Sequence, residues 1–168
     1  NLGKKAAKGY SLSYSVFENK LYSDEIVGQV GQPVASESFL LDKDASKTIS
    51  TKFNIDGAKL WSAEKPNRYT LVVELKDKKG KTVDVFSSFF GICKVEIKDT
   101  KAEDDEFGLA GRYFYVNNMP VKLKGVNRQE INPNSGNSIT HEQMEEEIMI
   151  MKRGNINHVR NSHYSCDP

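Results

Sequence analysis

The feature that most limits the fold of this chain is a change of hydrophobic period near residue 98. Before it, apolar residues alternate with polar ones, which is the period of a half-buried strand. The alternation is clearest in residues 10–16, 49–55, 69–75 and 81–90. Asp77-Lys78-Lys79-Gly80 marks a hairpin turn. About seven short strands without a helical period predict an immunoglobulin-like antiparallel β-sandwich over residues 1–98.

The next stretch has a different composition. Residues 99–113 include Glu103-Asp104-Asp105-Glu106 followed by small residues, which predicts a solvated linker or insertion. These carboxylates lack the ligand spacing and turn glycine of a calcium-binding loop. We therefore expect a connection between two domains here.

Residues 114–168 carry the signals of a strand, a helix and another strand. Asn117-Asn118 between two apolar runs predicts a tight turn. Thr140, three residues before Gln143, predicts a capped helix start, and Gly154 predicts its end. Met144, Ile148 and Met151 would form the apolar stripe of that helix, and residues 156–160 the following strand. This order predicts the first βαβ unit of a truncated parallel sheet, whose remaining strands would lie beyond residue 168.

The amino-acid composition is that of an ordinary globular protein and excludes few classes of function. With 24 Lys and Arg against 23 Asp and Glu, the net charge of +1 gives no reason to expect nucleic acid or an anionic membrane as partner. No apolar run approaches the roughly 18 residues of a membrane helix. Cys93 and Cys166 lack the spacing of a zinc site or a disulfide framework, so we expect two free thiols. Two thiols are too few to indicate a compartment, and cytoplasm and periplasm both fit. The first methionine is Met119, which predicts a piece of a longer protein.

Five sequence motifs occur in a fixed order along the chain. They are Leu60-Trp-Ser-Ala-Glu-Lys-Pro-Asn-Arg-Tyr69, Phe90-Gly91 with Lys94-Val-Glu-Ile97, Val116-Asn-Asn-Met-Pro120, Lys124-Gly-Val-Asn-Arg128 and Val159-Arg-Asn-Ser-His-Tyr164. Together they resemble glycoside hydrolase family 2, in its β-galactosidase branch. The resemblance implies a multidomain retaining enzyme, of which this chain would be the immunoglobulin-like sandwich and the start of a (β/α)₈ TIM barrel.

The same resemblance implies roles for residues at the ends of the two barrel strands, where barrels of this type carry their active sites. Arg160 would hydrogen-bond the nucleophilic glutamate, and His163 would contact sugar hydroxyls. Asn127, Arg128 and Glu130 would shape the pocket wall. Both catalytic glutamates would lie on later strands, so no catalytic residue is expected here. Any Mg²⁺ or Na⁺ site would likewise use residues outside this chain.

Two of the departures from the family pattern lie near the expected site. Gln129 stands where the branch usually shows His, and Ser165 stands where Pro usually follows His-Tyr. A glutamine can hydrogen-bond a hydroxyl group, but it carries no charge near neutral pH. Sugar specificity is therefore less certain than family membership.

Several alternatives stay open at this point. Glu130 and Asp167 could serve as an acid and nucleophile pair within the chain, and Arg160 could be a purely structural strand-end residue. The enzyme could be a β-glucuronidase or β-mannosidase, although Asn127-Arg128 favours the galactosidase branch. The sandwich could instead be a non-catalytic carbohydrate-binding or spacer module. The incomplete barrel segment also predicts self-association, with the tail packing on the sandwich or on another copy.

Overall fold

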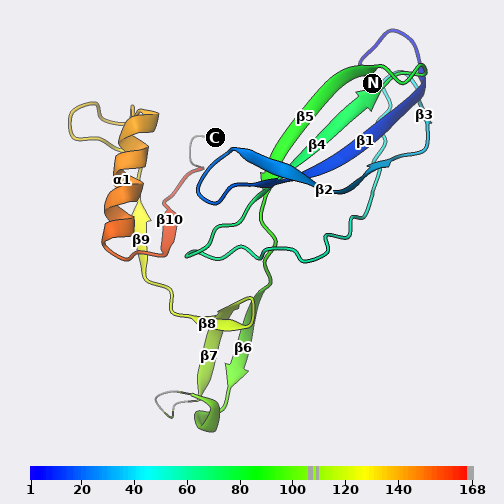
Figure 1. Cartoon of the computed structure of the whole chain (residues 1–168). Helices are drawn as coiled ribbons and strands as arrows, with labels where there is room; N and C mark the ends of the chain where they lie inside the picture. The colour runs from blue at the N-terminus through cyan, green and yellow to red at the C-terminus, as the bar shows by residue number, and fades with distance from the viewer. Residues whose placement is uncertain (106–107, 109, 166–168) are drawn as a thin grey trace. The chain divides into compact units, whose positions relative to one another are not determined.

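The computed structural model describes residues 1–105, 108 and 110–165, and it divides the chain into two units, Asn1–Cys93 and Lys94–Pro168. We describe each unit by itself (Figure 1). The fold is mainly β, as expected, and ends in a strand, helix, strand sequence. The division falls before residue 98 because the strand that contains this residue pairs with a later strand.

The first unit is built on one antiparallel sheet with the strand order β2-β1-β4-β5, and β3 pairs with the beginning of β1. The strands are β1 Ala7–Asn19, β2 Ile26–Ala35, β3 Phe39–Leu41, β4 Tyr69–Lys76 and β5 Thr82–Phe90. The unit thus contains five strands where the pattern predicted about seven. The turn between β4 and β5 is the predicted one, because the Asp77 carboxylate accepts hydrogen bonds from the backbone N–H groups of Lys79 and Lys81 at 2.8 and 3.0 Å.

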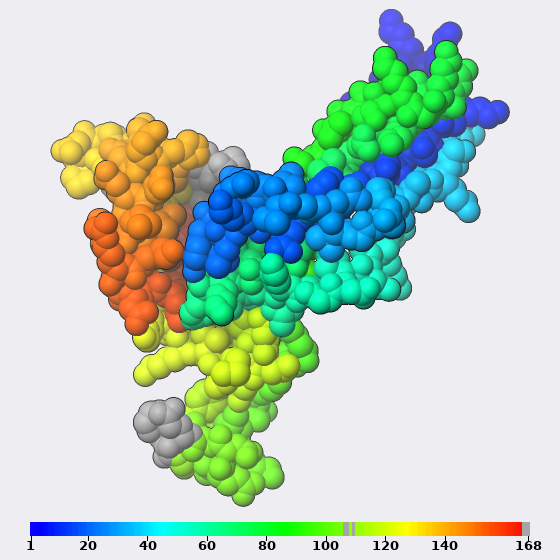
Figure 2. Space-filling view, viewed as in Figure 1, coloured from blue at the N-terminus to red at the C-terminus, as the bar shows by residue number. Residues whose placement is uncertain are grey.

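Residues 49–55 do not form the strand that their alternation predicted. Thr51, Phe53 and Ile55 are nevertheless half-buried, and the residues between them are exposed. Phe53 packs edge to face on Tyr14 of β1, with ring centroids 6.0 Å apart. Figure 2 shows this segment, in cyan, along the blue strands of the same unit. The alternation of residues 49–55 therefore correctly indicated which side chains turn inward. The segment is nevertheless not a strand, because its backbone does not pair with a neighbouring strand.

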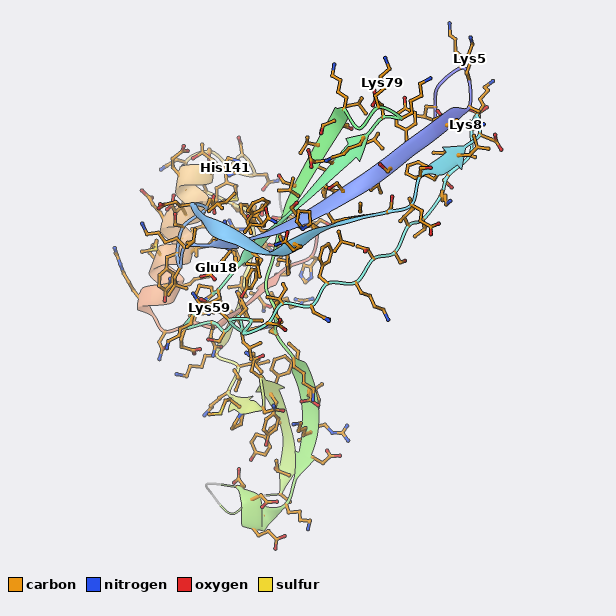
Figure 3. All side chains as sticks on the ribbon, turned by 45° about the vertical axis from the view of Figure 1, so that its right-hand side comes forward. Lys5, Lys8, Glu18, Lys59, Lys79 and His141 are labelled. Carbon is orange, nitrogen blue, oxygen red and sulfur yellow. The ribbon has the colours of Figure 1, made fainter. Side chains whose placement is uncertain are left out.

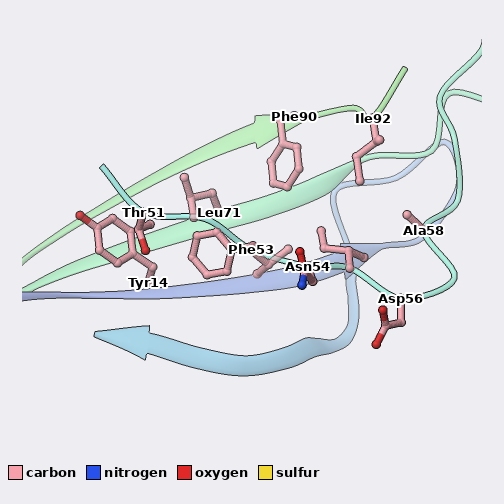
Figure 4. A pocket seen from close by; sticks show the side chains of 11 residues that line it. Tyr14, Thr51, Phe53, Asn54, Asp56, Ala58, Leu71, Phe90 and Ile92 are labelled. Carbon is pink, nitrogen blue, oxygen red and sulfur yellow. The ribbon is translucent and has the colours of Figure 1, made fainter. Parts of the chain in front are cut away.

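The core of this unit is small and centres on Tyr69, whose exposed fraction is 2%. Its ring stacks on Phe90 at 5.6 Å, and its hydroxyl accepts a hydrogen bond from the Lys59 N–H at 2.8 Å. Lys59 also forms an ion pair with Glu18 of β1 (Figure 3). A mainly apolar cavity of about 730 Å³ lies between the sheet and residues 51–58 (Figure 4).

The second unit begins with a three-stranded antiparallel sheet of β6 Val95–Thr100, β7 Gly111–Val116 and β8 Met119–Val121. Asn117 and Asn118 have φ values of 51° and 66°, which is the left-handed backbone of the predicted tight turn. The stretch predicted as a linker instead holds the end of β6, a 3₁₀ turn at Ala102–Asp104 and the start of β7. Charged side chains thus mark a hairpin connection; residues 106, 107 and 109 lie outside the described part of the chain.

The rest of the second unit is the predicted βαβ arrangement. β9 Gly125–Arg128 and β10 His158–Asn161 pair in parallel, and α1 His141–Arg153 connects them. The capping box of Thr140 and Gln143 begins the helix. The helix ends at Gly154 as expected, but Asn155, with φ 57°, takes the left-handed position. Asn157 then ties the strand starts together: its Nδ2 donates to the Lys122 carbonyl at 3.0 Å and its Oδ1 accepts from the Lys124 N–H at 2.8 Å.

The apolar stripe predicted for α1 is only partly right. Met144 and Met151 are half-buried, but Ile148 is 51% exposed. Glu147 occupies the half-buried face instead. The reason is electrostatic, because this carboxylate binds an arginine at the end of β9.

Candidate functional site

The parallel pairing of β9 and β10 separates the candidate residues onto two faces. Side chains alternate between the faces of a strand, so Asn127 and Arg128 point to opposite sides. Asn127 lies opposite Arg160 in the register, and Arg160 Nη1 donates to Asn127 Oδ1 at 3.5 Å. Arg128 instead contacts helix α1 through Glu147. Asn127 and Arg160 therefore share the face that the helix does not cover.

The side chains on the uncovered face are polar and open to solvent. Asn127 and Arg160 are both exposed, and their mutual hydrogen bond is at the long limit for such contacts. Gln129 follows β9 directly and His163 lies just past β10; both are exposed as well. These positions are the carboxyl ends of parallel strands, where α/β barrels bind their substrates. The group offers amide, guanidinium and imidazole donors to a ligand rich in oxygen.

Behind this face lies an ion-pair network of Arg128, Glu130 and Glu147. Arg128 Nε is 2.8 Å from Glu147 Oε2, and Arg128 Nη1 is 3.0 Å from Glu130 Oε1. The exposed fractions of the three side chains are 11%, 11% and 31% in the order Arg128, Glu130, Glu147. Burial opposes the charge of Arg128, but the hydrogen bonds to Glu147 and Glu130 outweigh it and raise the pKa of the guanidinium. The Arg128 side chain thus lies on the helix side of β9, where its guanidinium contacts both Glu147 and Glu130.

Hydrogen bonds of the backbone and of two side chains hold the segments that follow the two strands. The Glu130 N–H donates to the Tyr164 hydroxyl at 2.9 Å, and the Ser162 N–H donates to the Arg128 carbonyl at 2.9 Å. Asn161 Nδ2 donates to the Tyr164 carbonyl at 3.1 Å. Counted as whole residues, backbone included, Glu130 and Ser162 are buried, with exposed fractions of 8% and 3%. The loop after β9 and the tail after β10 therefore form one anchored structure.

Sequence reasoning missed Glu147 and the anchoring role of Tyr164. A signal for Glu147 was present, because it lies three residues after Met144 and four before Met151, on the apolar side of the helix. A glutamate at such a position needs a buried partner. Tyr164 gave no comparable signal, since its contact depends on how two segments far apart in sequence meet.

The other candidate residues, Glu130 with Asp167 and the two cysteines, do not form a second site among the described residues. Glu130 is engaged by Arg128, and Asp167, its suggested catalytic partner, lies outside the described residues together with Cys166. The thiol of Cys93 is free and exposed. Over the described ranges, no three His, Cys, Asp or Glu residues gather as metal ligands would. Helix α1 is too short to cross a membrane, and the described residues contain no helix long and apolar enough to do so.

Comparison with known protein families gives matches over most of the chain. Residues 12–92 match the model described as "Glycosyl hydrolases family 2". Residues 107–168 match "Glycosyl hydrolases family 2, TIM barrel domain". The second match covers β9, α1 and β10 together with the anchored tail.

Individual relatives agree with the family models. A curated β-galactosidase of Priestia megaterium is 35% identical over 152 residues, which cover 90% of this chain but 13% of that protein. The chain thus spans a small part of the relative's length. Among solved structures, a putative β-galactosidase of Bacteroides fragilis matches with a TM-score of 0.79 at 21% identity. The match covers 99% of this chain and 22% of the chain of that structure. A β-glucuronidase of Parabacteroides merdae has a TM-score of 0.69 at 22% identity, covering 98% and 17%. The similarity of these two structures supports the fold described above for this chain.

Proposed function

Because the chain belongs to glycosyl hydrolase family 2, we propose that it forms part of a retaining β-galactosidase and supplies one wall of its active site. The observation that carries the proposal is the pairing of Asn127 with Arg160 at the carboxyl ends of two parallel strands. This pair lies in a chain that is 35% identical to a curated β-galactosidase over 152 residues. The proposed reaction is hydrolysis of terminal β-linked galactose through a covalent glycosyl intermediate.

In this proposal the exposed face of β9 and β10 holds the nucleophile and the sugar. Arg160 hydrogen-bonds the nucleophilic glutamate with its guanidinium, which keeps the carboxylate ionised and oriented. Its present contact with Asn127 is long, so its donors are available for that partner. His163 contacts sugar hydroxyls, and Gln129 offers an uncharged amide to the same region.

The chemistry itself requires residues outside this chain. A retaining glycosidase uses two carboxyl groups roughly 5 to 5.5 Å apart, one as nucleophile and one as acid and base. We assign both to glutamates on later barrel strands, so the 168-residue chain alone is inactive in this proposal. Any Mg²⁺ or Na⁺ would also be held by residues beyond these. Self-association through the barrel segment stays a prediction.

The substrate class is tested with the full-length protein and a panel of nitrophenyl β-glycosides. We expect the galactoside to have the highest kcat/KM, since Asn127-Arg128 favours the galactosidase branch. Initial rates of nitrophenol release measure this directly. Dominant cleavage of the glucuronide or the mannoside would replace the proposed substrate within the same family. No cleavage of any glycoside, together with millimolar binding of galactosides by the first unit, Asn1–Cys93, would favour the binding module instead.

A further inference from the structure

We propose that Glu147 of helix α1 is a positioning residue for the active site, acting through Arg128 on Glu130 and Gln129. This inference rests on the proposed function. Glu147 Oε2 accepts a hydrogen bond from Arg128 Nε at 2.8 Å, across 19 residues of sequence. The contact joins the middle of the helix to the last residue of β9.

The guanidinium of Arg128 is held from two directions. Glu147 takes the Nε edge and Glu130 takes Nη1, at 2.8 and 3.0 Å. Nη2 is buried, and the described residues offer it no hydrogen-bond partner. A guanidinium is planar and rigid, so two carboxylates on different edges define its orientation. Without Glu147, Glu130 would be the one remaining partner that the described contacts give this side chain.

The orientation of Arg128 matters because Gln129 lies between two anchored residues. On one side, the carbonyl of Arg128 accepts from Ser162; on the other, the N–H of Glu130 donates to the Tyr164 hydroxyl. The side chains of Arg128 and Glu130 form an ion pair with each other. This pair and the backbone of Gln129 together make a closed ring. The exposed Gln129 side chain therefore takes its direction from a network that Glu147 completes from behind.

The chemistry of the contact separates two substitutions. Glu147→Ala removes the acceptor and leaves Arg128 Nε unpaired on a side chain that is 11% exposed. Glu147→Gln keeps an oxygen acceptor at the same reach and removes only the charge. Glu146→Ala is the matched control, because Glu146 is the exposed neighbour on the same helix.

The experiment measures kcat and KM of the full-length enzyme on nitrophenyl β-galactoside. We expect Glu147→Ala to lower kcat by about 10- to 100-fold with a smaller change in KM, since misplacing a transition-state contact by about 1 Å costs this much. Glu147→Gln should stay within about threefold of wild type, because its amide oxygen still accepts from Nε. Glu146→Ala should behave as wild type.

A second readout does not depend on activity. Hydrogen exchange of peptides that cover residues 126–132 should quicken in Glu147→Ala and stay unchanged in Glu146→Ala. If the wild-type enzyme cleaves no glycoside, the proposed function fails while this readout still tests the network. Equal exchange in both variants would overturn the positioning role. So would wild-type kcat in a Glu147→Ala enzyme that has lost only thermal stability.

Discussion

Replacing Arg128 with methionine is expected to lower the free energy of unfolding by about 3–5 kcal/mol, because the change leaves two carboxylates without their shared cation. Glu130 and Glu147 are 11% and 31% exposed, and both contact this guanidinium. Methionine has a similar length and cannot bind either. Denaturant unfolding of the protein with and without the substitution measures the loss.

Arg112→Met is the matched control for Arg128→Met. Arg112 also forms an ion pair in the second unit, with Asp99 at 2.7 Å, but both side chains are more than 70% exposed. An exposed pair of this kind is screened by solvent, so Arg112→Met should leave the free energy of unfolding nearly unchanged. If the two substitutions lower the free energy of unfolding equally, the Arg128 network stabilises the fold no more than an exposed ion pair does.

Replacing Arg160 with alanine in the full-length enzyme is expected to lower kcat/KM for a β-galactoside by about 10²–10³-fold. This is the effect of removing one preorganised donor from a charged transition state. The proposed contact is with the nucleophile rather than the sugar, so most of the loss should fall on kcat. Initial-rate kinetics over a range of galactoside concentrations separate the two parameters.

In the 168-residue chain Arg160 is exposed, and its hydrogen bond to Asn127 is long, at 3.5 Å. Removing it from this chain should change the free energy of unfolding by no more than about 0.5 kcal/mol, which separates a kinetic loss in the full-length enzyme from a folding defect of this segment. Arg160→Lys keeps the charge but loses the planar fork, and it should recover only part of the activity. Wild-type kcat/KM in the alanine variant would make Arg160 a structural strand-end residue, the alternative that the sequence left open.

Local features of the fold were predictable because they depend on neighbours in sequence. The turn at Asp77, the asparagine turn at Asn117-Asn118 and the capping box at Thr140 are satisfied by contacts within a few residues. Residues 49–55 show the opposite case. Their alternation gave the right inward side chains, but a strand also needs a paired neighbour, which no local pattern specifies.

The strands that carry the candidate residues were predictable, but the direction of each side chain was not. The βαβ order predicted two parallel strands here, and Asn127 and Arg160 lie next to their last residues, whereas the roles of these side chains rest on the family resemblance. That Arg128 turns toward the helix depends on the exact limits of β9, and sequence patterns locate strand limits poorly. Glu147 meets Arg128 only when helix phase and strand register are both known.

The proposed function requires that this chain carry supporting residues while the nucleophile lies elsewhere in the enzyme. A 2-deoxy-2-fluoro-β-galactoside with a good leaving group tests it, because the fluorine slows breakdown of the covalent intermediate formed by a retaining enzyme. The labelled residue in the full-length protein is then located by mass spectrometry of its peptides. We expect the label on a glutamate outside these 168 residues. A label on Glu130, or on any other carboxylate of this chain, would contradict it.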